Sequence, residues 1–302
     1  MGRSYKSSKT YTSQAKSPPV VNSRSAPKEK GRHLTVQRLN HDSSWLLSLE
    51  SGSLRIVLDP WLTGAEIDGF SLFNRAEHTS ATLQVADLGR VDAIVVSMAF
   101  SDHCHEETLS QLPSNIPIYA VRDALARIKG DARLSSRNLI LIEDRPTRIG
   151  NSRTSVSHIP TSGLLDFVHQ GLVVSSPESS IVYAPHGLIL SGPTAQRLKK
   201  VSEAGKRISL CLVTASTYDL PLIIGGTVNL GLDKALPLLR ALRPKYLIDT
   251  HSEQKTATGF VPLVARTAYP SHEEVRERVR KECGKATRIV DAPHLDPIPL
   301  RL

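Results

Sequence analysis

An acidic residue and two histidines stand shortly after an apolar segment of the chain. The segment is Ala93–Ser97, and the polar residues are Asp102, His103 and His105. Carboxylate and imidazole groups are oxygen and nitrogen ligands of catalytic zinc, and a histidine also exchanges protons near neutral pH. The loop after this segment is therefore a candidate metal-binding or proton-transfer site.

The same loop residues also have a purely structural interpretation. Asp102 can cap a helix beginning near Glu106, or support its loop through backbone hydrogen bonds. His105 can form a surface hydrogen bond. Cys104 has no established cationic partner and is interpreted as a small buried residue rather than as a nucleophile.

The segment before the loop has the pattern of a central strand. Ala93–Ser97 is short, continuous and rich in β-branched residues, as in strands buried on both faces. The first three of the other predicted strands are separated by short turns and indicate an antiparallel meander. The other predicted strands are Leu34–Leu39, Trp45–Leu49, Leu54–Leu58, Ile118–Val121, Leu139–Glu143, Arg153–Ser157, Gly171–Ser175, Ser180–Ala184, Ile208–Thr214, Tyr246–Asp249 and Arg288–Val290.

Helix signals alternate with these strands and are clearest in the last third of the chain. One helix is expected from Thr194 to Gly205, and a second has Asp233 as its N-cap and Pro237 in its first turn. A capping box, Ser271–Glu274, opens a third. Shorter helices are expected over 106–112 and up to Gly130. Two strand-rich runs, each followed by helices, fit an α/β fold of two mixed sheets packed face to face with helices outside. An ordinary α/β fold gives a similar alternation.

Charge divides the chain into two parts. Residues 1–32 contain eight Lys or Arg and one acid, so they carry +7 of the formal +9. We predict a disordered, basic, Ser-rich tail over 1–32 and a folded domain over 33–302, for which nucleic-acid binding is not indicated. The tail could itself tether the chain to acidic membranes or to nucleic acid.

Cysteine content and hydropathy bear on the compartment. The three cysteines stand at unrelated spacings, which favours a reducing, intracellular location, and we expect a cytoplasmic protein. No apolar run approaches the roughly 20 residues of a transmembrane helix. Import into an organelle through the N-terminal tail stays open.

The loops after the predicted strands resemble those of the metallo-β-lactamase superfamily, in its divergent fungal and plant-type branch. That superfamily carries Ser-His-x-His-x-Asp-His after one strand. Asp102 and His103 match the last two residues of this motif, whereas Met98 and Phe100 stand where its paired histidines belong. Asp59, in Leu58-Asp59-Pro60-Trp61, is similar to the early acid of the superfamily.

Three further histidines extend the resemblance. His158 and His251 follow predicted strands where the superfamily has its third-motif and last histidines, and His186 stands where it has a bridging acid. The resemblance implies an αββα sandwich and a metal centre with one half-site lost at Met98 and Phe100.

The resemblance also implies roles for individual residues. The retained half-site would use Asp102, His103 and His251, with His186 as a neutral replacement for the bridging acid. Asp59 would orient a ligand from outside the site, and Trp61 would form core or pocket wall. The candidate metal ligands are Asp102, His103, His186, His251 and, less favoured because its partners are lost, His158; the candidate catalytic residues are Asp102 and His105, the latter as a ligand or proton shuttle.

Two functions from different classes follow. The first is a metal-dependent hydrolase with an atypical mononuclear site, which binds zinc or another divalent metal and acts on a small molecule of unidentified class. Its metal would lower the pKa of a bound water to about 7. The second is a catalytically inactive metallo-β-lactamase-like binding protein, which the apolar Met98 and Phe100 suggest. The sequence leaves the oligomeric state open.

Overall fold

The computed structural model describes residues 33–161, 163, 166–203 and 208–302, without the side chains of 202 and 203. The predicted basic tail, 1–32, lies outside the described residues. Within the described ranges, no helix has both the length and the apolar character needed to cross a bilayer.

The first of two large sheets combines an antiparallel and a parallel half. Strands β20, β1, β2 and β3 pair antiparallel, and β3, β6, β7 and β8 pair parallel. The predicted meander of β1, β2 and β3 is confirmed. In spatial order the seven strands are β20 (Ile298–Arg301), β1 (His33–Arg38), β2 (Trp45–Leu49), β3 (Leu54–Leu58), β6 (Ala93–Val96), β7 (Ile118–Ala120) and β8 (Leu139–Leu141).

The second large sheet repeats this arrangement with the other half of the chain. Strands β9 to β12 pair antiparallel, whereas β12, β13, β16 and β19 pair parallel. In spatial order they are β19 (Arg288–Ile289), β16 (Tyr246–Asp249), β13 (Ile208–Val213), β12 (Ser180–Ala184), β11 (Gly171–Ser175), β10 (Ser155–Ile159) and β9 (Thr147–Arg148).

The alternation of side chains along β12 shows why its continuous apolar run is buried on both faces. Ile181 and Tyr183 point into the core between the two large sheets, whereas Val182 and Ala184 belong to a second core under the helices. Successive residues of a strand face opposite sides of a sheet. A central strand of a layered fold therefore needs apolar residues at every position.

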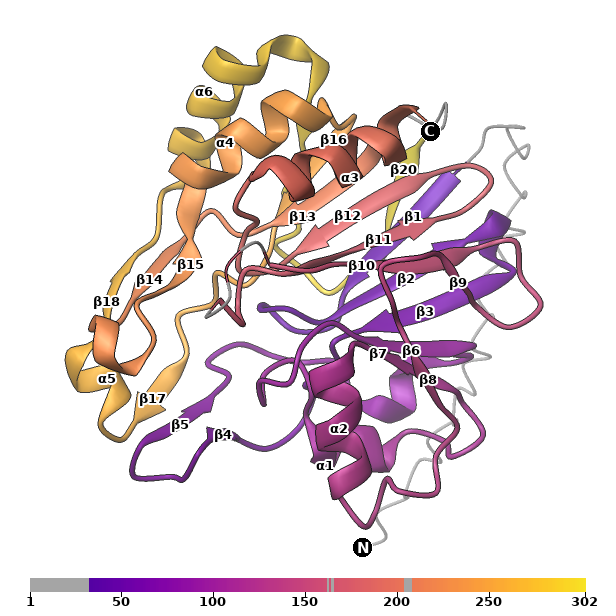
Figure 1. Cartoon of the computed structure of the whole chain (residues 1–302), viewed down its shortest axis with the longest axis vertical. Helices are drawn as coiled ribbons and strands as arrows, with labels where there is room; N and C mark the ends of the chain where they lie inside the picture. The colour runs from indigo at the N-terminus through magenta and orange to yellow at the C-terminus, as the bar shows by residue number, and fades with distance from the viewer. Residues whose placement is uncertain (1–32, 162, 164–165, 204–207) are drawn as a thin grey trace, which may run out of the picture. The chain divides into compact units, whose positions relative to one another are not determined.

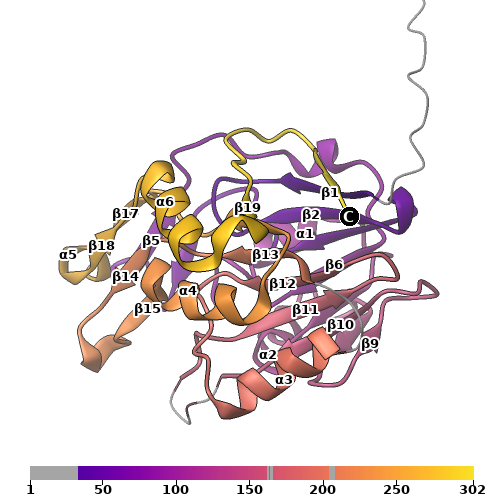
Figure 2. The ribbon, with the colours of Figure 1, turned by 90° about the horizontal axis from the view of Figure 1, so that it is seen from above.

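Helices form the two outer layers (Figure 1). Helices α1 (Glu106–Gln111) and α2 (Arg122–Gly130) lie against the first sheet, and α3 (Gly192–Glu203), α4 (Gly231–Leu242) and α6 (His272–Cys283) lie against the second. Figure 2 shows the latter three on the near side of the second sheet. The predicted sandwich of two mixed sheets with helices outside is confirmed.

Two small sheets project from one end of the large ones (Figures 1 and 2). One consists of β15 (Thr227–Leu230), β14 (Thr217–Asp219) and β18 (Arg266–Ala268), and the other of β17 (Thr256–Thr258), β5 (Asn74–Glu77) and β4 (Glu66–Asp68). The remaining short helices are α5 (Val261–Val264), η1 (Glu50–Gly52), η2 (Val85–Leu88), η3 (Leu222–Ile224) and η4 (Gly284–Ala286).

Helix α4 begins earlier than the sequence indicates. Asp233 is not its N-cap, because the helix starts at Gly231, and Pro237 lies beyond the first turn. Gly231 has φ +69°, and a Cβ there would lie 2.4 Å from Cγ2 of Thr217. A glycine is thus required where the chain turns tightly from β15 into the helix. The N-cap of the predicted capping box of α6 agrees with the structure, since the Ser271 hydroxyl accepts a hydrogen bond from the backbone N–H of Glu274.

Candidate metal centre

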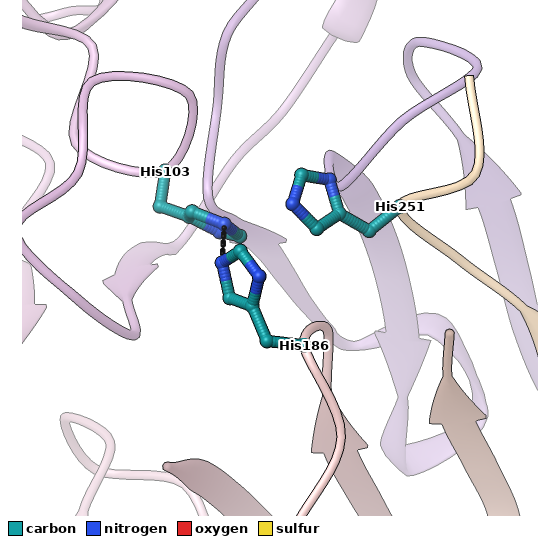
Figure 3. Close-up of side chains that lie close together, drawn as sticks. All are labelled: His103, His186 and His251. Carbon is teal, nitrogen blue, oxygen red and sulfur yellow. Dashed lines mark hydrogen bonds between the residues drawn. The ribbon is translucent and has the colours of Figure 1, made fainter. Parts of the chain in front are cut away.

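Three histidines from separate loops meet at the ends of parallel strands (Figure 3). His103 follows β6 of the first sheet, and His186 and His251 follow β12 and β16 of the second. One ring nitrogen of each lies within 4.8 Å of the others. Their exposed fractions are 0, 2 and 7 %, so the cluster is buried. The junction of the two sheets therefore carries a set of imidazoles that could hold one metal ion.

Tight backbone turns aim two of these side chains. His251 has φ +56°, and Gly187, directly after His186, has φ +93°. A Cβ on Gly187 would lie 2.9 Å from the Cβ of Leu230, whose N–H donates to the carbonyl of His186 at 3.0 Å. The turn after β12 therefore needs a glycine to let His186 point at the other two imidazoles.

The second ring nitrogen of each histidine has a fixed partner. Nδ1 lies 2.7 Å from a carboxylate oxygen of Asp59 in His103, from Oδ1 of Asn229 in His186, and from a carboxylate oxygen of Asp42 in His251. These oxygens accept hydrogen bonds, so Nδ1 is the protonated nitrogen and Nε2 faces the cluster. Such outer partners fix both the tautomer and the orientation of metal-binding histidines. The donor set therefore fits a divalent metal.

Asp59 is the most heavily bonded of these partners. It accepts from the backbone N–H of Ser97 at 2.7 Å, from the Ser97 hydroxyl at 2.5 Å and from the Tyr183 hydroxyl at 2.7 Å, in addition to His103. Burial and the carboxylate of Asp59 raise the pKa of Tyr183 well above its usual value, so the phenol stays a donor. These bonds hold the Asp59 carboxylate in one orientation against the imidazole.

The pKa values of two neighbouring imidazoles are shifted in opposite directions. Burial lowers the pKa of His103, but the carboxylates of Asp102 and Asp59 outweigh it and raise that pKa to about 9. Burial, together with His251 and His103, holds the pKa of His186 well below its usual value. Their Nε2 atoms lie 3.0 Å apart, and binding of a metal ion between them would release the proton that joins them.

Asp102 adds a carboxylate beside the imidazoles. Its oxygens lie 3.6 Å from Nε2 of His103 and 3.5 Å from Nε2 of His251. Burial raises the pKa of Asp102, but His103, Lys255 and His251 outweigh it and hold that pKa well below the usual value. An ionised carboxylate, a candidate oxygen ligand, thus stands beside the imidazoles of His103 and His251.

His105 and His158 are not brought into the cluster. His105 caps α1, where its Nδ1 accepts from the backbone N–H of Thr108, and its other nitrogen lies 3.3 Å from the carbonyl of Ala65. His158 does not follow a strand, as the sequence suggested, but lies inside β10, which runs on to Ile159. Its Nε2 lies 2.7 Å from Oε1 of Gln170.

Met98 and Phe100, which stand in place of the paired histidines of the motif, have apolar side chains. Met98 is completely buried, and the ring of Phe100 lies edge-on to His186 with centroids 6.3 Å apart. Cys104 is also buried, and burial raises its thiol pKa far above the usual value, which does not suit a nucleophile. Trp61 is buried and packs on His78, with ring centroids 3.7 Å apart.

Sequence reasoning missed four polar residues of this region. They are Asp42, in the turn between β1 and β2; Asn229, on β15; Glu66, on β4; and Lys255, four residues after His251. None of the four belongs to the motifs on which the resemblance rests, and all but Lys255 lie in other segments of the sequence. The only signal was the short spacing of His251 and Lys255 within one loop.

Solved structures with the same fold include two hydrolases and a diiron hydroxylase. An isothiocyanate hydrolase from Delia radicum gut bacteria aligns with a TM-score of 0.62 and 15 % identity, covering 89 % of this chain and 100 % of that one. Igni18, a metallo hydrolase from Ignicoccus hospitalis, aligns with a TM-score of 0.62 and 13 % identity, covering 89 % and 99 %. CmlA, a diiron β-hydroxylase from Streptomyces venezuelae, aligns with a TM-score of 0.60 and 16 % identity, covering 91 % of this chain and 55 % of that one.

At these identities the structural matches establish the fold alone. The comparison with curated protein sequences gives no match. The sequence of residues 36–201, more than half of the chain, matches the β-lactamase superfamily domain. Together with the αββα sandwich and the cluster of histidines at the strand ends, this match shows that the chain belongs to the metallo-β-lactamase superfamily.

Proposed function

We propose that this protein is a metal-dependent hydrolase with a single-metal centre held by His103, His186, His251 and Asp102. The observation that carries the proposal is the convergence of three buried imidazoles, each with Nδ1 held by an outer partner. A divalent metal bound there would supply a Lewis acid and lower the pKa of a coordinated water to about 7.

The residues around the ligands have distinct tasks in this proposal. Asp59, Asn229 and Asp42 keep the three imidazoles in the orientation that directs Nε2 inward. Asp102 provides the negatively charged ligand. Met98 fills the place of a superfamily histidine with a completely buried apolar side chain, which supports one metal rather than two.

The donor set favours zinc among divalent metals. Imidazole nitrogens and a carboxylate oxygen are the ligand types of catalytic zinc, whereas magnesium and calcium prefer oxygen ligands. Two structures with the same fold are named hydrolases, which supports hydrolysis as the reaction class. An ester, thioester, amide or phosphoester of a small molecule is the substrate class we propose.

Metal analysis of the full chain tests the proposal. The protein is stripped with chelator, equilibrated separately with zinc, manganese and iron, dialysed, and assayed for bound metal and for hydrolysis of p-nitrophenyl esters and bis(p-nitrophenyl) phosphate. We expect about one zinc per chain and turnover that chelation removes. Folded protein with about one metal and no turnover would instead favour the inactive binding protein. Less than about a tenth of an equivalent of every metal would rule out the centre.

A further inference from the structure

A half-buried lysine ammonium, with 18 % of its side chain exposed, lies beside the histidine cluster among three carboxylates. Nζ of Lys255 is 3.1 Å from Oδ2 of Asp42, 3.3 Å from Oδ2 of Asp102 and 3.9 Å from Oε1 of Glu66. It also lies 5.1 Å from the centroid of the Trp61 ring, where a cation–π contact holds it. Partial burial of an ammonium group is tolerated when carboxylates surround it in this way.

The loop that carries Lys255 is anchored on both sides of the site. The backbone N–H of His251 donates to the carbonyl of Asp42 at 3.0 Å. Glu253 accepts from the backbone N–H groups of Thr79 and Ser80 at 3.1 and 3.0 Å. The ammonium therefore projects from a fixed backbone rather than from a free surface arm.

Two carboxylates contact the ammonium and the histidine cluster together. Oδ2 of Asp102 lies 3.3 Å from Lys255 Nζ and 3.5 Å from His251 Nε2. Asp42 contacts His251 through Oδ1 and Lys255 through Oδ2. Ligand atoms of Asp42, Asp102 and His251 also lie within 4.8 Å of one another. Without the ammonium, this oxygen-rich set would offer donors to a second divalent cation.

We propose that Lys255 is a resident cation that restricts the centre to one metal ion, because its ammonium occupies the carboxylate-lined place beside Asp102 that a second divalent cation would need. The inference rests on the proposed function for the first metal. A fixed positive charge on shared carboxylates repels a second cation and uses the lone pairs that would bind it. The number of metal ions is thus limited on two sides of the centre, by the apolar side chain of Met98 and by the ammonium of Lys255.

The test compares metal stoichiometry in charge-neutral and charge-retaining variants. Lys255→Ala removes the ammonium and opens its space, Lys255→Gln removes the charge but keeps hydrogen-bond donors for Asp42 and Asp102, and Lys255→Arg keeps the charge. Each full-length protein is equilibrated with manganese or zinc and its metal per chain is measured. Manganese samples are also examined by electron paramagnetic resonance for exchange coupling between two ions. Circular dichroism checks that each variant is folded.

We expect one metal in the wild type and in Lys255→Arg, and two, with exchange-coupled manganese, in Lys255→Ala. The Lys255→Gln variant should bind more than one equivalent of metal per chain. It keeps the test valid if the alanine variant does not fold. One metal in both neutral variants, or two in the wild type, would overturn the inference while leaving the metal centre in place. No metal in the wild type would overturn the proposed function, and the inference with it.

Discussion

Oδ2 of Asp59 lies 2.7 Å from Nδ1 of His103, and both side chains are completely buried. Asp59 follows β3 and His103 lies in the loop after the neighbouring parallel strand β6, so the contact joins two strand ends. The backbone of Asp59 is in the left-handed region, with φ +42°. An unfavourable local conformation is maintained there by the bonds that the carboxylate makes.

Asp59→Asn is expected to weaken metal binding without removing any ligand. The neutral amide is a weaker acceptor for His103 Nδ1–H, and loss of such an outer partner lowers metal affinity by about 10- to 100-fold. Competition with a chromophoric chelator measures the affinity. Asp92→Asn is the matched control, because Asp92 also accepts a backbone N–H, from Arg55, outside the site. Equal affinities in the two variants would contradict an orienting role for Asp59.

Substitution of the candidate ligands should rank their importance. Asp102→Ala and His251→Ala are each expected to lower metal affinity by orders of magnitude and to abolish any hydrolysis, because each removes a proposed ligand. His158→Ala should leave the metal content unchanged and lower the free energy of unfolding by about 1 kcal/mol, since the His158 imidazole makes a hydrogen-bond contact with Gln170, outside the cluster. A His158→Ala protein without metal, beside an Asp102→Ala protein that retains it, would require a different ligand set.

Gly187→Ala should disturb both stability and metal binding. Its new Cβ would meet the Cβ of Leu230 at 2.9 Å, and relief of that contact must move the turn that carries His186. Gly284→Ala is the control, because Gly284 also has positive φ but no atom within 4 Å of the new Cβ. We expect about 1–2 kcal/mol of strain in the control and a larger loss in Gly187→Ala, measured by urea denaturation. Metal affinity should fall only in Gly187→Ala.

Arg137→Ala should destabilise the first sheet and its helices. The guanidinium is buried and donates to the carbonyl oxygens of Leu109, Leu112, Pro113 and Ile116 at 2.9–3.2 Å. Loss of the donors leaves buried carbonyl groups without partners. We therefore expect the free energy of unfolding, measured by urea denaturation, to fall by about 2–4 kcal/mol.

Arg133→Ala provides the control for Arg137→Ala. Arg133 is exposed and pairs with Asp131 at the surface, so its loss should change stability by less than about 1 kcal/mol. Similar losses in the two variants would show that the carbonyl cage around Arg137 does not stabilise the fold.

The buried thiol of Cys211 predicts loss of stability at alkaline pH. Burial raises its pKa from 9.0 to about 12. The folded pKa exceeds the unfolded one, so the stabilising contribution is fully present below pH 9 and is lost as the pH rises towards 12. The Cys211→Ala variant should be less stable than the wild type at pH 8. Its midpoint of urea denaturation should fall less than that of the wild type between pH 8 and pH 10.5. Cys283→Ala, at a partly exposed thiol, should follow the wild type.

Local patterns in the sequence were sufficient for much of the secondary structure. Five predicted strands, Trp45–Leu49, Leu54–Leu58, Gly171–Ser175, Ser180–Ala184 and Tyr246–Asp249, have the predicted bounds. Each is a short apolar run bounded by polar, Gly or Pro residues, and such a run is specified by neighbouring residues alone. The start of α6 was likewise predicted, because Ser271 and Glu274 are close in sequence. The start of α4 was not, because it depends on the approach of Thr217 to Gly231.

The membership of the histidine cluster was decided by tertiary structure. The sequence placed His103, His186 and His251 near strand ends, but strand order and the packing of the two sheets determine which ends meet. The same packing brings Asp42 to His251 across 209 residues, and Asn229 to His186 across 43. It also leaves His158 inside β10, where the strand continues to Ile159. Residue types near strand ends are local properties of a sequence, whereas the contacts of a buried polar group depend on segments that only the folded chain brings together.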